Sequence, residues 1–246
     1  MLTAKFMSGH SKWSTIKRQK GAADVKRGAT FTKISNAITI AVKQGGGVAD
    51  PDQNPRLRLA IEMARAANMP KDNIERAITR ATAKGEGELV EVTYEGFAPG
   101  GVAVLVEAIT DNTNRTTSEV KSLFNKSGAN FARPGAVGYQ FEQTGEITVN
   151  KSGKSIDDIF LIAAELGALD VQGEGDTVAI YTDVPSLSKI KDGLIAAELE
   201  VTNAEISRKP KNTIDVALEE KEKIINFLSS LESMDDVQKV YSNISL

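Results

Sequence analysis

The chain has 246 residues, of which 41% are hydrophobic and 26% are charged, as in an ordinary globular protein. It contains no cysteine and one histidine, His10, which excludes disulfides, thiolate metal sites, a Cys nucleophile and histidine-rich metal sites. The longest wholly apolar run, residues 159–164, is far shorter than the ~20 residues of a membrane helix. No secretory pattern opens the sequence, so we expect a cytoplasmic protein without membrane contact, metal or cofactor.

The net charge of −3 conceals a strong division along the chain. Residues 1–84 carry 16 Lys+Arg and 6 Asp+Glu, a net of +10, whereas residues 85–246 carry 14 and 27, a net of −13. A basic segment of this kind favours a polyanionic partner, nucleic acid above all. The alternative is charge balance between two domains that touch.

The basic part, residues 1–84, predicts three helices. Apolar residues recur with a period near 3.6 over residues 31–43. Asn54 and Pro55 suit the N-cap and first turn of a second helix, and Asp72 suits the N-cap of a third. Short amphipathic helices bury their stripes against one another, so we expect a basic three-helix bundle.

Beyond the glycine-rich hinge at residues 84–87, apolar residues alternate with polar ones, which predicts strands. A terminal helix and strand cannot bury their apolar faces alone, so we expect them to complete this middle domain, formed by residues 85–136 and 210–246. Its expected elements are strands at 90–94 and 102–109, a helix at 114–126, a helix around 224–231 and a strand at 237–241.

Residues 137–209 predict an inserted domain in which strands and helices follow the βαββαβ order of ferredoxin-like folds. The expected fold class is therefore α+β multidomain: an N-terminal three-helix bundle plus two α/β domains, one inserted in the other. The expected elements are strands at 137–141 and 147–149 around a turn at 143–145, a helix at 156–166, a hairpin of strands 169–172 and 177–182, a helix at 186–198 and a strand at 201–207.

Gly153, Lys154 and Ser155 resemble the end of a phosphate-binding loop. The full pattern needs a glycine where this chain has Thr148, so the loop cannot wrap its backbone around phosphates in the same way. We expect Ser155 to cap a helix instead.

Glu95 and Asp111 are candidates for a carboxylate pair, but their sequence spacing does not set their separation. We favour structural roles for the two segments that contain them. With no nucleophile paired to a base, we expect no enzymatic activity.

Lysine and arginine side chains concentrated in the basic part are the candidate nucleic-acid ligands, because each neutralised phosphate releases counterions. Trp13, the only tryptophan, lies among them and either stacks on an unpaired base or anchors the N-terminal arm to the bundle. The candidate binding residues are Lys12, Trp13, Lys17, Arg18, Lys20, Lys26, Arg27, Lys33, Arg56, Arg58, Arg65, Arg76, Arg80 and Lys84.

Several motifs resemble the YebC family, in order from Met7 to the C-terminus. The opening Gly9–Trp13 with Ile16, Lys17, Lys20 and Asp24 is similar to the family's signature, and two departures occur, at Phe97 and Ala98, where the family pattern has Tyr and Gly. The further matching segments are 54–58, 68–78, 94–101, 111–116 and 135–141.

The resemblance implies an N-terminal helical domain and two α/β domains around a cleft. It also implies regulation of gene expression: bacterial members are described as DNA-binding transcriptional regulators and have been linked to stalled ribosomes, while a mitochondrial relative activates translation.

Three hypotheses follow for function. The first is a DNA-binding transcriptional regulator, and the alternative is a ribosome-associated RNA-binding translation factor that acts on stalled or inefficient translation. The third, an enzyme with its site in a cleft, is disfavoured by the absent cysteine and the single histidine. The acidic part repels phosphate, so we expect it to face a protein partner or to be held away from the nucleic acid.

Overall fold

The computed structural model describes residues 23–82 and 89–245. These residues form two compact units, one of residues 23–138 with 217–240 and the other of residues 139–216 with 241–245. Within the described residues, no helix is both long enough and apolar enough to cross a membrane.

The first unit begins with the helices α2 (Ala23–Gln44), α3 (Pro55–Ala66) and α4 (Lys71–Thr82). Helices α3 and α4 both pack on α2, and Ile38 and Leu57 are fully buried in their shared core. The expected three-helix bundle is confirmed. Helix α2 starts at Ala23, earlier than the predicted residue 31, because its first turns lack the apolar stripe that the prediction relied on.

Asn54 holds the bundle's first connection together. As the N-cap of α3, its side chain accepts a hydrogen bond from the Leu57 backbone N–H at 3.0 Å. The same side chain donates to the carbonyls of Ala41 at 2.9 Å and Val48 at 3.0 Å. Gly45 passes so close that a Cβ there would overlap the Asn54 amide. One buried side chain thus joins the end of α2, the following loop and the start of α3.

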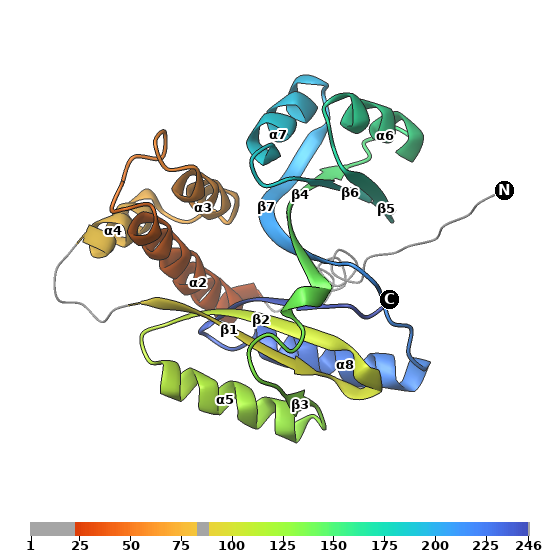
Figure 1. Cartoon of the computed structure of the whole chain (residues 1–246). Coiled ribbons are helices and arrows are strands. Elements are labelled where there is room, and N and C mark those ends of the chain that lie inside the picture. The colour runs from red at the N-terminus through yellow and green to blue at the C-terminus, as the bar shows by residue number, and fades with distance from the viewer. Residues whose placement is uncertain (1–22, 83–88, 246) are drawn as a thin grey trace. The chain divides into compact units, whose positions relative to one another are not determined.

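The first unit also contains a four-stranded sheet in the order β3-β1-β2-β8. Helices α5 and α8 pack against each other beside it, with the rings of Phe124 and Phe227 in edge-to-face contact at 4.9 Å (Figure 1). The elements are β1 (Val90–Phe97), the 3-10 turn η1 (Pro99–Gly101), β2 (Ala103–Thr110), α5 (Thr113–Lys126), β3 (Asn130–Phe131), α8 (Leu218–Glu232) and β8 (Val237–Ser242).

The second unit contains a four-stranded sheet in the order β5-β6-β4-β7, with antiparallel pairing throughout. Its chain order and strand order are those of a ferredoxin-like domain. Helices α6 and α7 lie together on one face of the sheet (Figure 1). The elements are η2 (Gly138–Gln140), β4 (Phe141–Asn150), α6 (Ile156–Glu165), β5 (Asp170–Glu174), β6 (Thr177–Thr182), α7 (Leu187–Ala196) and β7 (Glu200–Pro210).

One local prediction is wrong. The two short strands expected around a turn at residues 143–145 are a single strand, β4, and the residues before it form the 3-10 turn η2. Gly145 lies inside the ladder, where a Cβ would overlap the Thr182 hydroxyl and press on Leu187. This glycine serves close packing beneath α7, and not a change of chain direction.

Candidate nucleic-acid interface

The structure describes eight of the fourteen predicted binding residues. Lys26 and Arg27 lie within the first turns of α2. Lys33 lies further along α2, Arg56, Arg58 and Arg65 lie on α3, and Arg76 and Arg80 lie on α4. The remaining six lie outside the described residues: Lys12, Trp13, Lys17, Arg18, Lys20 and Lys84.

Lys33 and Arg56 are engaged by partners on the first sheet and its helices. The Lys33 ammonium donates to the Glu232 carbonyl of α8 at 2.6 Å. The Arg56 guanidinium forms an ion pair with Glu91 of β1 and donates to the Gln44 side chain. The Glu232 and Glu91 partners lie 199 and 35 residues away in sequence, so spacing alone could not reveal them. Lys33 and Arg56 join the helical bundle to the first sheet and its helices.

Arg58 and Arg65 are seven residues apart on α3 and therefore lie on the same side of that helix, two turns from each other. The Arg58 guanidinium donates to the carbonyls of Pro51 at 3.0 Å and Asp52 at 2.9 Å. Carbonyls orient this group without cancelling its charge. Arg65 is exposed, and the described part of the chain offers its side chain no ion pair or hydrogen bond.

Arg76 and Arg80 lie one turn apart on the exposed side of α4. Arg76 donates to the Asp72 carbonyl at 3.3 Å and to the Asn73 side chain. The same helix carries an exposed ion pair between Lys71 and Glu75, with 3.4 Å between the charged groups. Acidic residues therefore interrupt the basic surface on both helices: Asp72 and Glu75 on α4, and Glu62 on α3 between Arg58 and Arg65.

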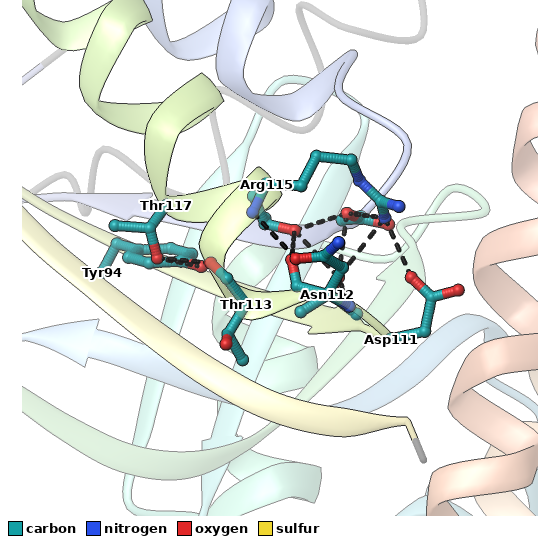
Figure 2. A network of polar contacts seen from close by, with 9 residues as sticks. Tyr94, Asp111, Asn112, Thr113, Arg115 and Thr117 are labelled. Atoms are coloured by element: carbon teal, nitrogen blue, oxygen red, sulfur yellow. Dashed lines mark hydrogen bonds and ion pairs between the residues drawn. The ribbon is translucent and has the colours of Figure 1, made fainter. Parts of the chain in front are cut away.

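A second polar site surrounds the start of α5 (Figure 2). Asn112 is the N-cap, and its side chain accepts from the Arg115 backbone N–H at 3.1 Å. Thr117 donates to the Thr113 carbonyl at 2.6 Å and lies 3.2 Å from the Tyr94 hydroxyl (Figure 2). The structural role expected for the segment that contains Asp111 is thus a helix cap, which Asn112 provides.

Asp236, just before β8, completes this network. One of its carboxylate oxygens accepts from the Thr116 hydroxyl at 2.6 Å, the Arg115 guanidinium at 2.8 Å and the Thr110 hydroxyl at 3.1 Å. Burial alone would raise the pKa of Asp236, but these hydrogen bonds outweigh it and lower the pKa. Arg115 also pairs with Asp111 at 3.1 Å, so the network fastens β2, α5 and the start of β8 together.

Glu95 has a separate set of partners. Its carboxylate accepts from the backbone N–H groups of Val137 at 2.6 Å, Gly135 at 2.8 Å and Gly138 at 2.8 Å. Glu95 therefore shapes the loop that follows β3, whereas Asp111 pairs with Arg115. Each of the two carboxylates that could have formed an acid–base pair is committed to its own structural contact.

Ser155 caps α6, as expected. Its hydroxyl accepts from the Asp158 backbone N–H at 3.1 Å, and the Asp158 carboxylate accepts from the Ser155 backbone N–H at 3.2 Å, which is a capping box. Elsewhere in the described ranges, no group of three or more His, Asp or Glu residues is arranged to hold a metal ion.

Comparisons with known proteins agree across nearly the whole chain. Residues 11–84 match the family description "TACO1/YebC protein N-terminal domain", and residues 89–244 match "TACO1/YebC second and third domain". Relatives named "Probable transcriptional regulatory protein" are 49% identical in Roseiflexus castenholzii and 48% identical in Dictyoglomus turgidum, each over 98% of this chain and 96% of the relative. The crystal structure of a conserved hypothetical protein from Aquifex aeolicus is 44% identical and superposes with a TM-score of 0.84, covering 90% of this chain and 91% of that one.

Proposed function

The chain belongs to the TACO1/YebC family, and we propose that it is a cytoplasmic, non-enzymatic, nucleic-acid-binding regulator of gene expression. The division of charge carries this proposal. Residues 23–82 hold 10 Lys+Arg and 6 Asp+Glu, a net of +4, and residues 1–22 add five Lys+Arg and no acidic residue. Fixed cations on a helical bundle are the electrostatic requirement for binding a phosphate backbone.

The first candidate ligand is DNA. The relatives' printed name, "Probable transcriptional regulatory protein", supports a DNA-binding transcriptional regulator. On this proposal, Arg58 and Arg65 contact phosphates from α3, and Arg76 and Arg80 extend the contact onto α4. Such contacts position a protein on nucleic acid but do not read its sequence.

The second candidate ligand is structured RNA, including that of the ribosome. Residues 139–216 carry 7 Lys+Arg and 14 Asp+Glu, a net of −7. A polyanion that ran along the whole protein would be repelled by this unit, whereas a local contact with a folded RNA through the bundle avoids it. This charge favours a translation factor that engages RNA through the bundle alone.

The test is a salt titration of the full-length chain, by fluorescence anisotropy, on a labelled single-stranded RNA and a labelled DNA duplex. The double variant Arg58→Ala/Arg65→Ala removes two bundle cations. The matched control, Lys121→Ala/Lys126→Ala, removes two exposed cations of α5 and changes the net charge equally.

We expect the bundle variant to weaken binding to every sequence. For each phosphate that the variant no longer neutralises, the negative slope of log K against log salt should become shallower, by about 0.7 on single strands and about 0.9 on duplex. The α5 control should leave this slope unchanged. Equal losses of affinity in the two double variants would show that net charge, and not the bundle surface, governs binding, and would contradict the proposal.

A further inference from the structure

Helix α6 is apolar over most of its surface, although it packs on only one face of the second sheet. Seven of its ten residues are Ile, Phe, Leu or Ala, yet only Ile159 and Ala163 are buried. The sheet therefore covers one side of α6, and apolar side chains remain on the opposite side. A helix that is apolar all round is normally covered on every side. Within the described residues, the outer side of α6 is left uncovered.

The exposed apolar side chains of α6 follow one another along the helix. Ile156, Phe160 and Ala164 recur every four residues and therefore form a row. In this row Ile156 is 41% and Phe160 is 49% exposed, and Ala164 is exposed as well. Leu161, which is 61% exposed, lies beside the row. These four residues form one apolar strip along the outer side of α6.

Leu169 extends this strip. It lies just before β5 and is 64% exposed. A Cβ at Gly173 of β5 would overlap Ile156, so Gly173 faces α6. Side chains alternate along a strand, and Leu169, four residues earlier, therefore faces the same side. Contiguous exposed apolar patches on soluble proteins mark interaction sites. The α6 apolar surface consists of Ile156, Phe160, Leu161, Ala164 and Leu169.

Acidic side chains border the α6 apolar surface. Asp157 and Glu165 are exposed and lie one turn before and one turn after Leu161, on the same line of the helix. Neither carboxylate forms an ion pair or a hydrogen bond with another described residue. The third acid of α6, Asp158, is committed to the capping box and is attracted by Lys154. Helix α6 itself contains no lysine or arginine, so its exposed line is negative at both ends.

This charge selects among the partners that could cover the surface. A second copy of the chain would bring the same acidic line and the same net of −7 over residues 139–216, and like charges across an interface oppose association. Nucleic acid is repelled for the same reason. A segment that carries apolar side chains between lysines or arginines satisfies both the apolar strip and its two free carboxylates.

We propose that the α6 apolar surface docks a basic amphipathic helix of another protein. The apolar side of that helix covers Phe160, Leu161 and Leu169, and its cations pair with Asp157 and Glu165. These two acids are eight residues apart, which is about 12 Å along the axis of α6. Two cations seven or eight residues apart on the docked helix match that separation. The proposal does not depend on nucleic-acid binding by the helical bundle.

The experiment is a fluorescence anisotropy titration of the full-length chain against a labelled amphipathic helical peptide. The basic probe places leucines on one side and lysines eight residues apart beside them. An acidic probe carries glutamates in place of the lysines. A third probe has the composition of the basic one, with its leucines spread around the helix. Sedimentation of the free chain at several concentrations measures self-association separately.

Two pairs of variants test the apolar strip and the acidic line. Leu161→Ser removes an exposed apolar side chain from the surface, and Ile195→Ser removes one that is 52% exposed on α7, outside the surface. Because both side chains are exposed, circular dichroism should show that both variants fold. The charge variants, each removing two exposed carboxylates of the second unit, are Asp157→Asn/Glu165→Gln and its control Glu142→Gln/Glu198→Gln.

We expect saturable binding of the basic probe, weakened about 10-fold by Leu161→Ser and unchanged by Ile195→Ser. Asp157→Asn/Glu165→Gln should weaken binding about 3-fold relative to its control and reduce the dependence on salt. The acidic probe and the probe without an apolar side should bind more weakly than the basic probe. Absence of saturable binding, equal losses within either pair of variants, or equal binding of the acidic probe would each overturn the proposal. Self-association of the free chain that Leu161→Ser abolishes would assign the surface to a second copy and would also overturn it.

Discussion

The Glu95 carboxylate is bound by three backbone N–H groups of the loop that follows β3. Burial alone would raise the pKa of Glu95, but the bonds from Val137, Gly135 and Gly138 outweigh it and lower the pKa. A carboxylate with a lowered pKa in the folded state stabilises the fold above its unfolded pKa of 4.5. That contribution is lost as the pH falls through the lower, folded-state pKa.

Glu95→Gln should therefore destabilise the protein at pH 7 by about 2 kcal/mol, because hydrogen bonds to a charged acceptor are the stronger ones. The cost should shrink below pH 4.5, where the wild type progressively loses the same charge. Urea unfolding at several pH values measures both effects. The exposed Glu142→Gln variant is the control, and a Glu95→Gln cost that stays constant down to pH 2 would contradict this account.

Among the elements, α3 depends on a cap that does more than satisfy a helix end. Asn54 is buried and makes three hydrogen bonds, one to α3 and two to the end of α2 and its loop. An exposed cap is worth about 1 kcal/mol, whereas removing a buried partner also leaves the other polar groups unsatisfied.

We expect Asn54→Ala to cost about 2–4 kcal/mol and the exposed-cap variant Ser155→Ala to cost about 1 kcal/mol. Circular dichroism during chemical unfolding measures each loss of stability. Equal costs for the two variants would show that the bonds from Asn54 to Ala41 and Val48 contribute nothing beyond capping.

Glycine has opposite roles in β4 and α2. A Cβ at Gly145 would overlap Thr182, so Gly145→Ala should destabilise the second unit by about 1–3 kcal/mol through overpacking. Gly28 lies inside α2 with open space around it, so Gly28→Ala should stabilise that helix by up to about 1 kcal/mol. Melting temperatures that shift in opposite directions would support this assignment, and a neutral Gly145→Ala would contradict it.

Much of the fold was predictable at this scale, because helical stripes and strand alternation follow directly from burial. The apolar spacing predicted α3 and α4, and the element order predicted the ferredoxin-like domain. Gly145 was misread as part of a turn, because a sequence does not show that Thr182 and Leu187 would crowd its Cβ. The sequence shows where the lysines and arginines of the bundle lie along its helices. It does not show that Lys33 and Arg56 contact Glu232 and Glu91, since these partners come from distant segments.

For the whole molecule, the separation of charge is the property that most directly concerns function. The basic part carries +10 and the rest −13, so a net charge of −3 describes neither. Contact with about five phosphates gives a log–log salt slope of about −3.5 on single strands and −4.5 on duplex. Raising potassium chloride from about 50 to about 200 mM should then weaken binding about 130-fold and 500-fold, respectively. Binding that ignores salt would contradict an electrostatic contact.

The most direct test of the central claim is photo-crosslinking of the full-length chain to a 4-thiouridine RNA and a 4-thiothymidine DNA duplex, followed by mass spectrometry of the crosslinked peptides. We expect crosslinks within residues 11–84, including peptides of α3 and α4, and none in residues 139–216. The ligand that crosslinks more efficiently at equal concentration distinguishes RNA from DNA. Crosslinks concentrated in residues 139–216, with none in the helical bundle, would contradict the account.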